Sequence, residues 1–367
     1  MTIVLQVPVV QKMKIENSAQ WAAMANATVL IFAQNANFEK VLGKQQPCES
    51  VPAGYKVGYT YGEHSSYMCL AFNPYQYSMG VIVKFSAEAL AYYLQHSGLK
   101  VYEFLQQVQS SSDYDLRISR IDVDLEFLEP KFTVAKINKQ LKRTVEVCTQ
   151  KTVKGKKIMA RKPLQLRGFE ANGEIKTLYI GSPASDTELR IYHKGKEQIS
   201  RKGFRLETAL KHPKWIRFEA VFRGDYAHQL TEKMLQVSSD KQLSDLIVNV
   251  FLQKYYFRYR KSKRPTAYTL EMKKMLHAVE APLLPLVADD KAIEKKINYI
   301  MDGSGAVGTF YVVKQLWGDD ALAALLQYIY DEVQEWEANY STRRWLTRHG
   351  NDTLKTYPKI DDLLKKI

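Results

Sequence analysis

Two segments of this chain alternate apolar and polar residues with a period of two, which limits them to strands with one buried and one solvated face. The segment 117–127 is RISRIDVDLEF, and its second half places three acids between apolar residues. The segment 215–223 is WIRFEAVFR and alternates in the same way. Antiparallel sheets commonly bury one face and leave the other in water. We therefore predict an antiparallel sheet with one polar face.

The spacing of apolar residues changes to a period of about 3.6 after residue 226, which indicates helices. Before that point, strand patterns mix with short helices such as 87–96. We predict an α+β fold with an α/β domain over 1–228 and a mostly helical domain over 229–367. Helices of the C-terminal part are expected at 226–236, 239–253, 268–279, 291–300 and 321–338, with a loop at 302–308.

The net charge of +14, with a pI near 9.3, indicates a polyanionic partner for these 367 residues. No apolar run approaches the ~18 residues that span a bilayer, and the apolar N-terminal ten residues lack the features of a signal peptide. Nucleic acid is therefore the expected partner, and a membrane is not. Three scattered cysteines form neither a disulfide framework nor a CxxC metal site, which fits a reducing cytoplasm.

Two basic segments are the candidates for DNA contact. The segment 136–167 holds eleven Lys and Arg against one acid, and 254–264 mixes six cations with four aromatics. Cations bind phosphates and aromatics stack on unpaired bases. A solvated helix face or a loop explains such a run equally well, and half of the aromatics fit a buried core. The expected DNA-binding residues are Lys154, Lys156, Lys157, Arg161, Lys162, Arg217, Arg258, Arg260 and Lys261.

The segment 177–198, TLYIGSPASDTELRIYHKGKEQ, combines a tyrosine with flanking cations. It predicts two strands around a Gly-Ser-Pro turn, the second with Arg190, Tyr192 and Lys194 on one face. Tyrosine can attack a DNA phosphate, but its pKa of ~10 makes it a poor nucleophile at neutral pH. We expect Arg190, Lys194 and a metal ion to favour the phenolate.

Three carboxylates are expected on the same polar face if these strands share one core: Asp122, Asp124 and Glu219. Carboxylates without a Cys or His cluster suit a hard cation, Mg²⁺ or Mn²⁺, which would polarise a phosphodiester. The alternatives are a structural tyrosine, a solvated Asp-x-Asp face and a simple cross-strand pair of Arg217 with Glu219.

The order RIDVDLEF, LYIGSPASDTELRIYHKGKEQ, WIRFEAVFRGDYA resembles the Rep_trans family of rolling-circle replication initiators, over about residues 78–228. The resemblance implies a nickase fold related to the HUH endonucleases, with Tyr192 as the nucleophile and Asp122, Asp124 and Glu219 as the acids. The family usually has Asp or Asn at position 193. This difference leaves open a role for His193 itself as a local acid or base. No His-x-His pair occurs, so the metal would be held mostly by carboxylates.

This resemblance favours a metal-dependent nickase that starts rolling-circle replication at an origin, where DNA is single-stranded or forms a hairpin. The alternatives are a relaxase of an integrative conjugative element and a non-catalytic DNA-binding regulator on the same fold. An RNA-binding protein would explain the charge but not the acids. Members of the family often act as dimers, and the C-terminal region, with Trp317, Trp336 and Trp345, could dock a host helicase or a second subunit.

Overall fold

The computed structural model describes the chain except residues 7–16, 63–66, 110, 154–155, 172, 184, 204, 278–292, 299, 302–303, 339 and 367. It divides into two compact units, Met1–Val287 and Ala288–Ile367.

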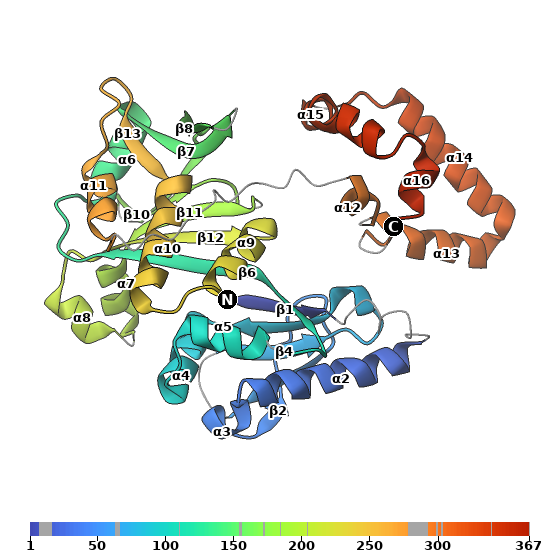
Figure 1. Cartoon of the computed structure of the whole chain (residues 1–367), viewed down its shortest axis with the longest axis horizontal. Coiled ribbons are helices and arrows are strands. Elements are labelled where there is room, and N and C mark those ends of the chain that lie inside the picture. The colour runs from blue at the N-terminus through green and yellow to red at the C-terminus, as the bar shows by residue number, and fades with distance from the viewer. Residues whose placement is uncertain are drawn as a thin grey trace. The chain divides into compact units, whose positions relative to one another are not determined.

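A ten-stranded sheet forms the frame of the first unit (Figure 1), and every strand pair described in it is antiparallel. The predicted α+β fold with an antiparallel sheet is therefore confirmed. The strands lie in the order β2 (Gln45–Pro47), β3 (Val57–Tyr61), β4 (Met68–Phe72), β5 (Val81–Phe85), β1 (Thr2–Gln6), β6 (Asp115–Phe127), β12 (Ile216–Arg223), β11 (Thr187–His193), β10 (Glu174–Ile180) and β9 (Leu166–Ala171).

Strand β6 joins the two halves of this sheet. Its first half pairs with β1, and its second half pairs with β12 from Arg120 to Phe127. The period-two pattern appears directly in the burial, because Ile121, Val123 and Leu125 are buried whereas Asp122 and Asp124 are exposed. The predicted strands at 117–127 and 215–223 are thus confirmed, each shifted by one or two residues at its start.

Helices pack on the apolar face of the sheet. Helix α9 packs on β6 and β12, and α6 packs on β10 and β11. The helices of this unit are α2 (Ser18–Asn35), α3 (Phe38–Leu42), the 3₁₀ helix η1 (Tyr77–Met79), α4 (Ala87–Ser97), α5 (Val101–Gln109), α6 (Val134–Arg143), α7 (Lys194–Arg201), α8 (Leu206–Lys211), α9 (Asp225–Met234), α10 (Asp240–Lys254) and α11 (Ala267–Lys274).

A second, three-stranded sheet has the order β13 (Tyr256–Tyr259), β7 (Val145–Val153) and β8 (Lys156–Arg161). It is tied to the large sheet by an aromatic cluster around the buried Phe218 of β12. The Phe218 ring centroid lies 5.0 Å from that of Phe127, 6.1 Å from Phe257 of β13 and 6.2 Å from Tyr268 of α11.

This cluster explains why the first unit is larger than expected. The boundary expected between residues 228 and 229 falls inside α9, and the division lies after Val287 instead. Helical periodicity begins near residue 226, but α9, β13 and α11 bury their apolar side chains in the core of the sheet. A change of period therefore marks a change of secondary structure here and not a change of domain.

The second unit consists of α12 (Ile293–Asn298), α13 (Ala306–Trp317), α14 (Asp319–Glu335), α15 (Tyr340–Thr356) and α16 (Ile360–Leu364). The loop expected at 302–308 ends early, because α13 begins at Ala306. Trp317 is 68% exposed and Trp336 is 56% exposed, so neither is a core residue of this unit. No described helix is long and apolar enough to cross a membrane.

Candidate active site

Strand register brings Tyr192 and Arg190 together with Asp124 and Glu219 on the polar face of the sheet. Strands β6, β12 and β11 are neighbours, so each cross-strand row contains one residue from each of them. One row contains Asp124, Glu219 and Arg190, and the next contains Glu126, Arg217 and Tyr192. The alternation in the sequence indicated a shared polar face, and the register places these side chains in two neighbouring rows of that face.

The hydroxyl of Tyr192 donates a hydrogen bond to Oε2 of Glu219 at 3.0 Å. Tyr192 is half-buried. Burial raises the pKa of its phenol well above 10, and the negative charge of Glu219 raises this pKa further. The phenol is therefore protonated at neutral pH, and Glu219 is placed to accept its proton.

The expectation that Arg190 and Lys194 favour the phenolate is wrong. Arg190 binds Glu219 at 3.1 Å and Glu188 at 3.4 Å, and the Tyr192 hydroxyl bonds to Glu219 and not to Arg190. Lys194 is not on the strand: it begins α7, is buried, and pairs with Glu197. Its Nζ lies 5.8 Å from the centroid of the Tyr192 ring.

Arg190 is held in place by a buried acid that was missed in the sequence. Glu188 is 2% exposed and lies among three arginines, Arg167 at 2.6 Å, Arg190 at 3.4 Å and Arg223 at 3.9 Å. Buried charges in proteins are normally paired in this way. The signal was available, because Glu188 precedes Arg190 by two residues and Tyr192 by four, which places all three on one face of a strand.

A second missed network fixes Arg217. This side chain pairs with Glu126 and lies 3.4 Å from Asp124. Glu126 also accepts hydrogen bonds from Arg205, at 2.7 and 2.9 Å, and the Arg205 guanidinium lies 4.3 Å from the Trp215 ring centroid. No local sequence pattern links Arg205 to the strands, because its partner Glu126 lies 79 residues earlier in the chain. Arg217 is therefore an internal counter-ion and not the free DNA-binding cation that we expected.

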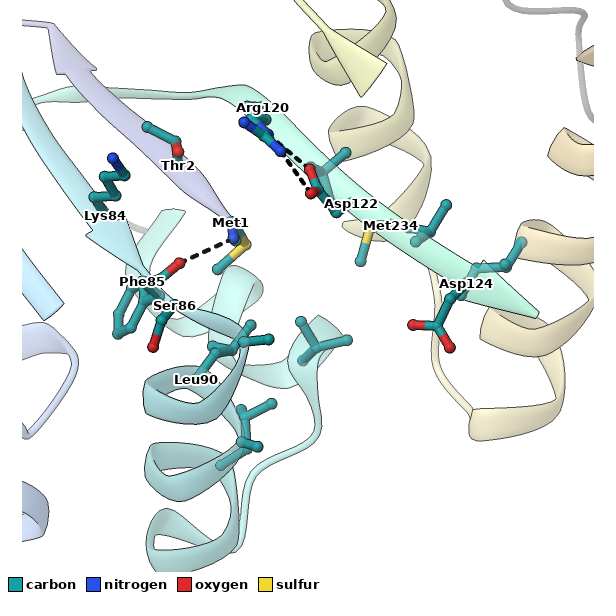
Figure 2. Close-up of a pocket in the computed structure, with 17 residues that line it drawn as sticks. Met1, Thr2, Lys84, Phe85, Ser86, Leu90, Arg120, Asp122, Asp124 and Met234 are labelled. Atoms are coloured by element: carbon teal, nitrogen blue, oxygen red, sulfur yellow. Dashed lines mark hydrogen bonds and ion pairs between the residues drawn. The ribbon is translucent and has the colours of Figure 1, made fainter. Parts of the chain in front are cut away.

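The two aspartates of β6 lie on the wall of a cavity of about 540 Å³ (Figure 2). The cavity lies where β1 begins, because Met1 and Thr2 line it and Thr2, the first residue of β1, is opposite Arg120 of β6. Asp122 accepts two hydrogen bonds from Arg120, both at 2.8 Å. The Asp124 side chain is 38% exposed, but the protein around it removes part of its hydration, and this desolvation raises its pKa above the ordinary value.

The three expected metal ligands are not gathered into one cluster. Among the residues that the structure describes, no three His, Cys, Asp or Glu side chains could together hold a metal ion. Asp122 lies in another cross-strand row, opposite Val221, whereas Asp124 lies directly opposite Glu219 across β6 and β12. All three acids contact an arginine, so the shared row of Asp124 and Glu219 is what distinguishes this pair. Mg²⁺ is commonly held by only one or two carboxylates together with phosphate oxygens of the substrate. Asp124 and Glu219 fit that smaller set.

His193 has a structural role at the start of α7. Its Nδ1 accepts a hydrogen bond from the backbone N–H of Lys196 at 3.0 Å, which makes it the N-cap of the helix. Burial lowers the pKa of His193, which favours the neutral ring that this cap requires.

The cations expected to bind DNA differ in their environments. Lys154 lies outside the described residues, as do the side chains of Lys156 and Lys157. Arg161 and Lys261 are exposed, as a phosphate contact requires. Lys162 is half-buried over the Tyr255 ring at 4.7 Å, and burial lowers its pKa to about 8.

Two arginines of the basic segment 254–264 hold the small sheet together. Arg258 binds the buried Glu146 at 2.8 Å, and Arg260 donates to the backbone carbonyls of Val145 and Leu141. Both side chains are therefore engaged within the protein, whereas we expected them to be free to bind DNA. Of the four aromatics in this segment, two are buried, as the core interpretation predicted: Tyr255 and Phe257.

The chain matches the model of the Rep_trans family, described as replication initiation factor, over residues 116–326, which is more than half of its length. The match begins after the expected start at residue 78 and continues past the expected end at 228. No curated protein matches the chain in sequence.

The structure is also similar to that titled "Structure of Rolling Circle Replication Initiator Protein from Geobacillus stearothermophilus". The two are 19% identical, with a TM-score of 0.48, and the alignment covers 66% of this chain and 85% of that one.

Proposed function

The chain belongs to the replication initiation factor family, and we propose that it starts rolling-circle replication by nicking one strand of origin DNA through Tyr192. The observation that carries this proposal is the hydrogen bond of 3.0 Å from the Tyr192 hydroxyl to Glu219, within the segment that matches the family. A nucleophile within hydrogen-bond reach of a base is the arrangement that covalent catalysis requires.

In the proposed reaction the Tyr192 oxygen attacks the scissile phosphorus while its proton passes to Glu219. The bond from phosphorus to the 3′ oxygen breaks, and that oxygen takes a proton from solvent. The products are a 5′-phosphotyrosine ester and a free 3′-hydroxyl that can prime synthesis. Because the ester keeps the energy of the broken bond, a 3′-hydroxyl can attack it and restore the strand without ATP.

Arg190 supports this reaction by its charge and its fixed position. Glu188 and Glu219 hold its guanidinium in the same row as the proton acceptor. A preorganised cation stabilises negative charge that develops on the phosphoryl oxygens without having to reorganise during the reaction.

Asp124 and Glu219 are the side chains that would hold a Mg²⁺ or Mn²⁺ ion. Such an ion would polarise the phosphodiester when bound. Binding of Mn²⁺, followed by electron paramagnetic resonance without DNA, should weaken in Asp124→Asn. Unchanged Mn²⁺ binding in that variant would remove Asp124 as a ligand.

The deciding experiment is a nicking assay on supercoiled DNA that carries the cognate origin, with Mg²⁺ or Mn²⁺. Tyr192→Phe should abolish both the nick and the covalent adduct on denaturing gels, while DNA binding survives. Tyr179→Phe is the matched control, because Tyr179 lies on the neighbouring strand β10 opposite Arg190. If Tyr192→Phe nicks normally and Tyr179→Phe does not, the nucleophile is Tyr179.

A further inference from the structure

An aromatic side chain that the chemistry above does not use lies in the same cross-strand row as the nucleophile. Phe169, on the edge strand β9, is opposite Thr177 of β10, which is opposite Tyr192 of β11. Side chains in one cross-strand row point to the same face of the sheet. With strands about 4.8 Å apart, Phe169 stands about 10 Å from Tyr192 along this row.

Phe169 is 59% exposed although it is a large apolar residue. A single exposed apolar residue is common on protein surfaces and needs no explanation by itself. The position of Phe169 is what sets it apart, because it shares its row with the proposed nucleophile and Thr177, the residue between them, has a small side chain.

A β-bulge lies beside Phe169, and it supports a functional role for this residue. The pairing of β10 with β9 shifts between Ile175 and Thr177, so Lys176 is an extra residue at this point. Such β-bulges occur frequently next to active sites, where they redirect a side chain.

Three cations lie on the elements around Phe169, and each of them is paired with an acid: Arg167 on β9 with Glu188, and Lys176 on β10 and Lys196 on α7 with Glu174. Arg167, two residues earlier on the same face, has its guanidinium 5.0 Å from the centroid of the Tyr179 ring. Lys176 and Lys196 both bind Glu174, at 2.9 and 3.1 Å. An open aromatic ring among cations is the combination that binds unpaired nucleic acid strands, since cations bind phosphates and rings stack on bases.

We propose that Phe169 is a stacking platform for an unpaired base of the DNA strand that Tyr192 cleaves. This inference rests on the proposed function for the identity of the ligand. A stacked strand advances about 3.4 Å per nucleotide, so the row distance of about 10 Å places this base within about three nucleotides of the scissile phosphate. Because the Thr177 side chain is small, it leaves room for the DNA strand between Phe169 and Tyr192.

The test measures binding of single-stranded DNA without cleavage. Fluorescence anisotropy of a labelled short oligothymidylate, in EDTA, should show binding about 5- to 150-fold weaker for Phe169→Ala, the range for one stacked base. Phe169→Trp should bind as tightly as the unchanged protein. Tyr75→Ala is the matched control, because Tyr75 is a 79% exposed aromatic outside the two catalytic rows, and it should have no effect.

Two results would overturn the inference. The first is unchanged affinity in Phe169→Ala, and the second is an equal loss of affinity in Phe169→Ala and Phe169→Trp. An oligonucleotide that contains 5-iododeoxyuridine should crosslink to Phe169 on irradiation. Crosslinks only to other residues would also contradict stacking on Phe169. None of these measurements depends on nicking. If Tyr192→Phe still nicks DNA, the proposed nucleophile is wrong, while the result for Phe169 stands on its own.

Discussion

Replacing Glu219 by glutamine tests the proton transfer at the centre of the proposed reaction. Glutamine keeps the shape of the side chain but cannot take the proton of Tyr192, which Glu219 contacts at 3.0 Å. Because the pKa of Tyr192 is raised above 10, fewer than about one phenol in 300 is ionised at pH 7.5 without a base. A general base typically contributes about 10²–10⁴-fold, so we expect Glu219→Gln to slow single-turnover nicking by about that factor.

The pH dependence separates loss of a base from damage to the site. In Glu219→Gln the rate should rise about tenfold per pH unit between about pH 7 and 9, as the ionised fraction of Tyr192 grows. Removing the charge of Glu219 also removes one cause of the raised pKa of Tyr192. Ultraviolet titration of the tyrosines should therefore show one phenol that ionises at lower pH than in the unchanged protein.

The matched control is Glu174→Gln, an exposed acid on β10 that pairs with Lys176 and Lys196. It should nick at the rate of the unchanged protein. If Glu219→Gln also nicks at that rate at pH 7.5, Glu219 is not the proton acceptor. A slow variant whose rate does not depend on pH would likewise contradict proton transfer as its role.

Three further predictions concern stability, and urea unfolding measures the first two. Burial lowers the pKa of Lys254 to about 7 from 10.5, so the unfolded chain binds more protons between these values and stability rises with pH across that window. Lys254→Met should raise the free energy of unfolding at pH 7 by up to about 4 kcal/mol, at about 1.4 kcal/mol per unit of lowered pKa, and flatten that rise. Burial also lowers the pKa of His193. Stability should therefore fall as pH drops below about 6.5, and His193→Asn, which keeps a cap acceptor, should remove this dependence. A chain that ends at residue 228 should not unfold cooperatively by circular dichroism, whereas one that ends at residue 287 should show a single transition, and the reverse result would favour the earlier domain boundary.

The polar face could be predicted from the sequence because a period of two is a local property. Alternation at 120–127 and 216–223, together with the Arg-Ile-Tyr strand, predicts that Tyr192 and Glu219 lie on one face of the sheet. This prediction does not require knowledge of which strands pair. The register that makes them contact depends on hydrogen bonds between distant strands, and alternation cannot supply it.

The charge balance of the site could not be predicted in the same way. Arg217 was expected to face DNA, but it pairs with Glu126 and lies 3.4 Å from Asp124. Lys194 was expected on the strand, but the chain enters α7 at this residue. Counting cations in a sequence overestimates the free positive charge, because carboxylates that lie far away in the sequence pair with them.

The central position of β1 has a consequence for the order in which the chain can fold during synthesis. β1 is synthesised before both of its neighbours in the sheet, which are β5, about 80 residues later, and β6, later still. At about 5–20 residues per second, its buried side chains Ile3 and Leu5 wait roughly 4–16 s for the first neighbouring strand. Throughout that interval an apolar strand with two open edges is available to other nascent chains. The interval between the synthesis of β1 and that of β5 is therefore a period in which the nascent chain is exposed to aggregation and a chaperone would protect it.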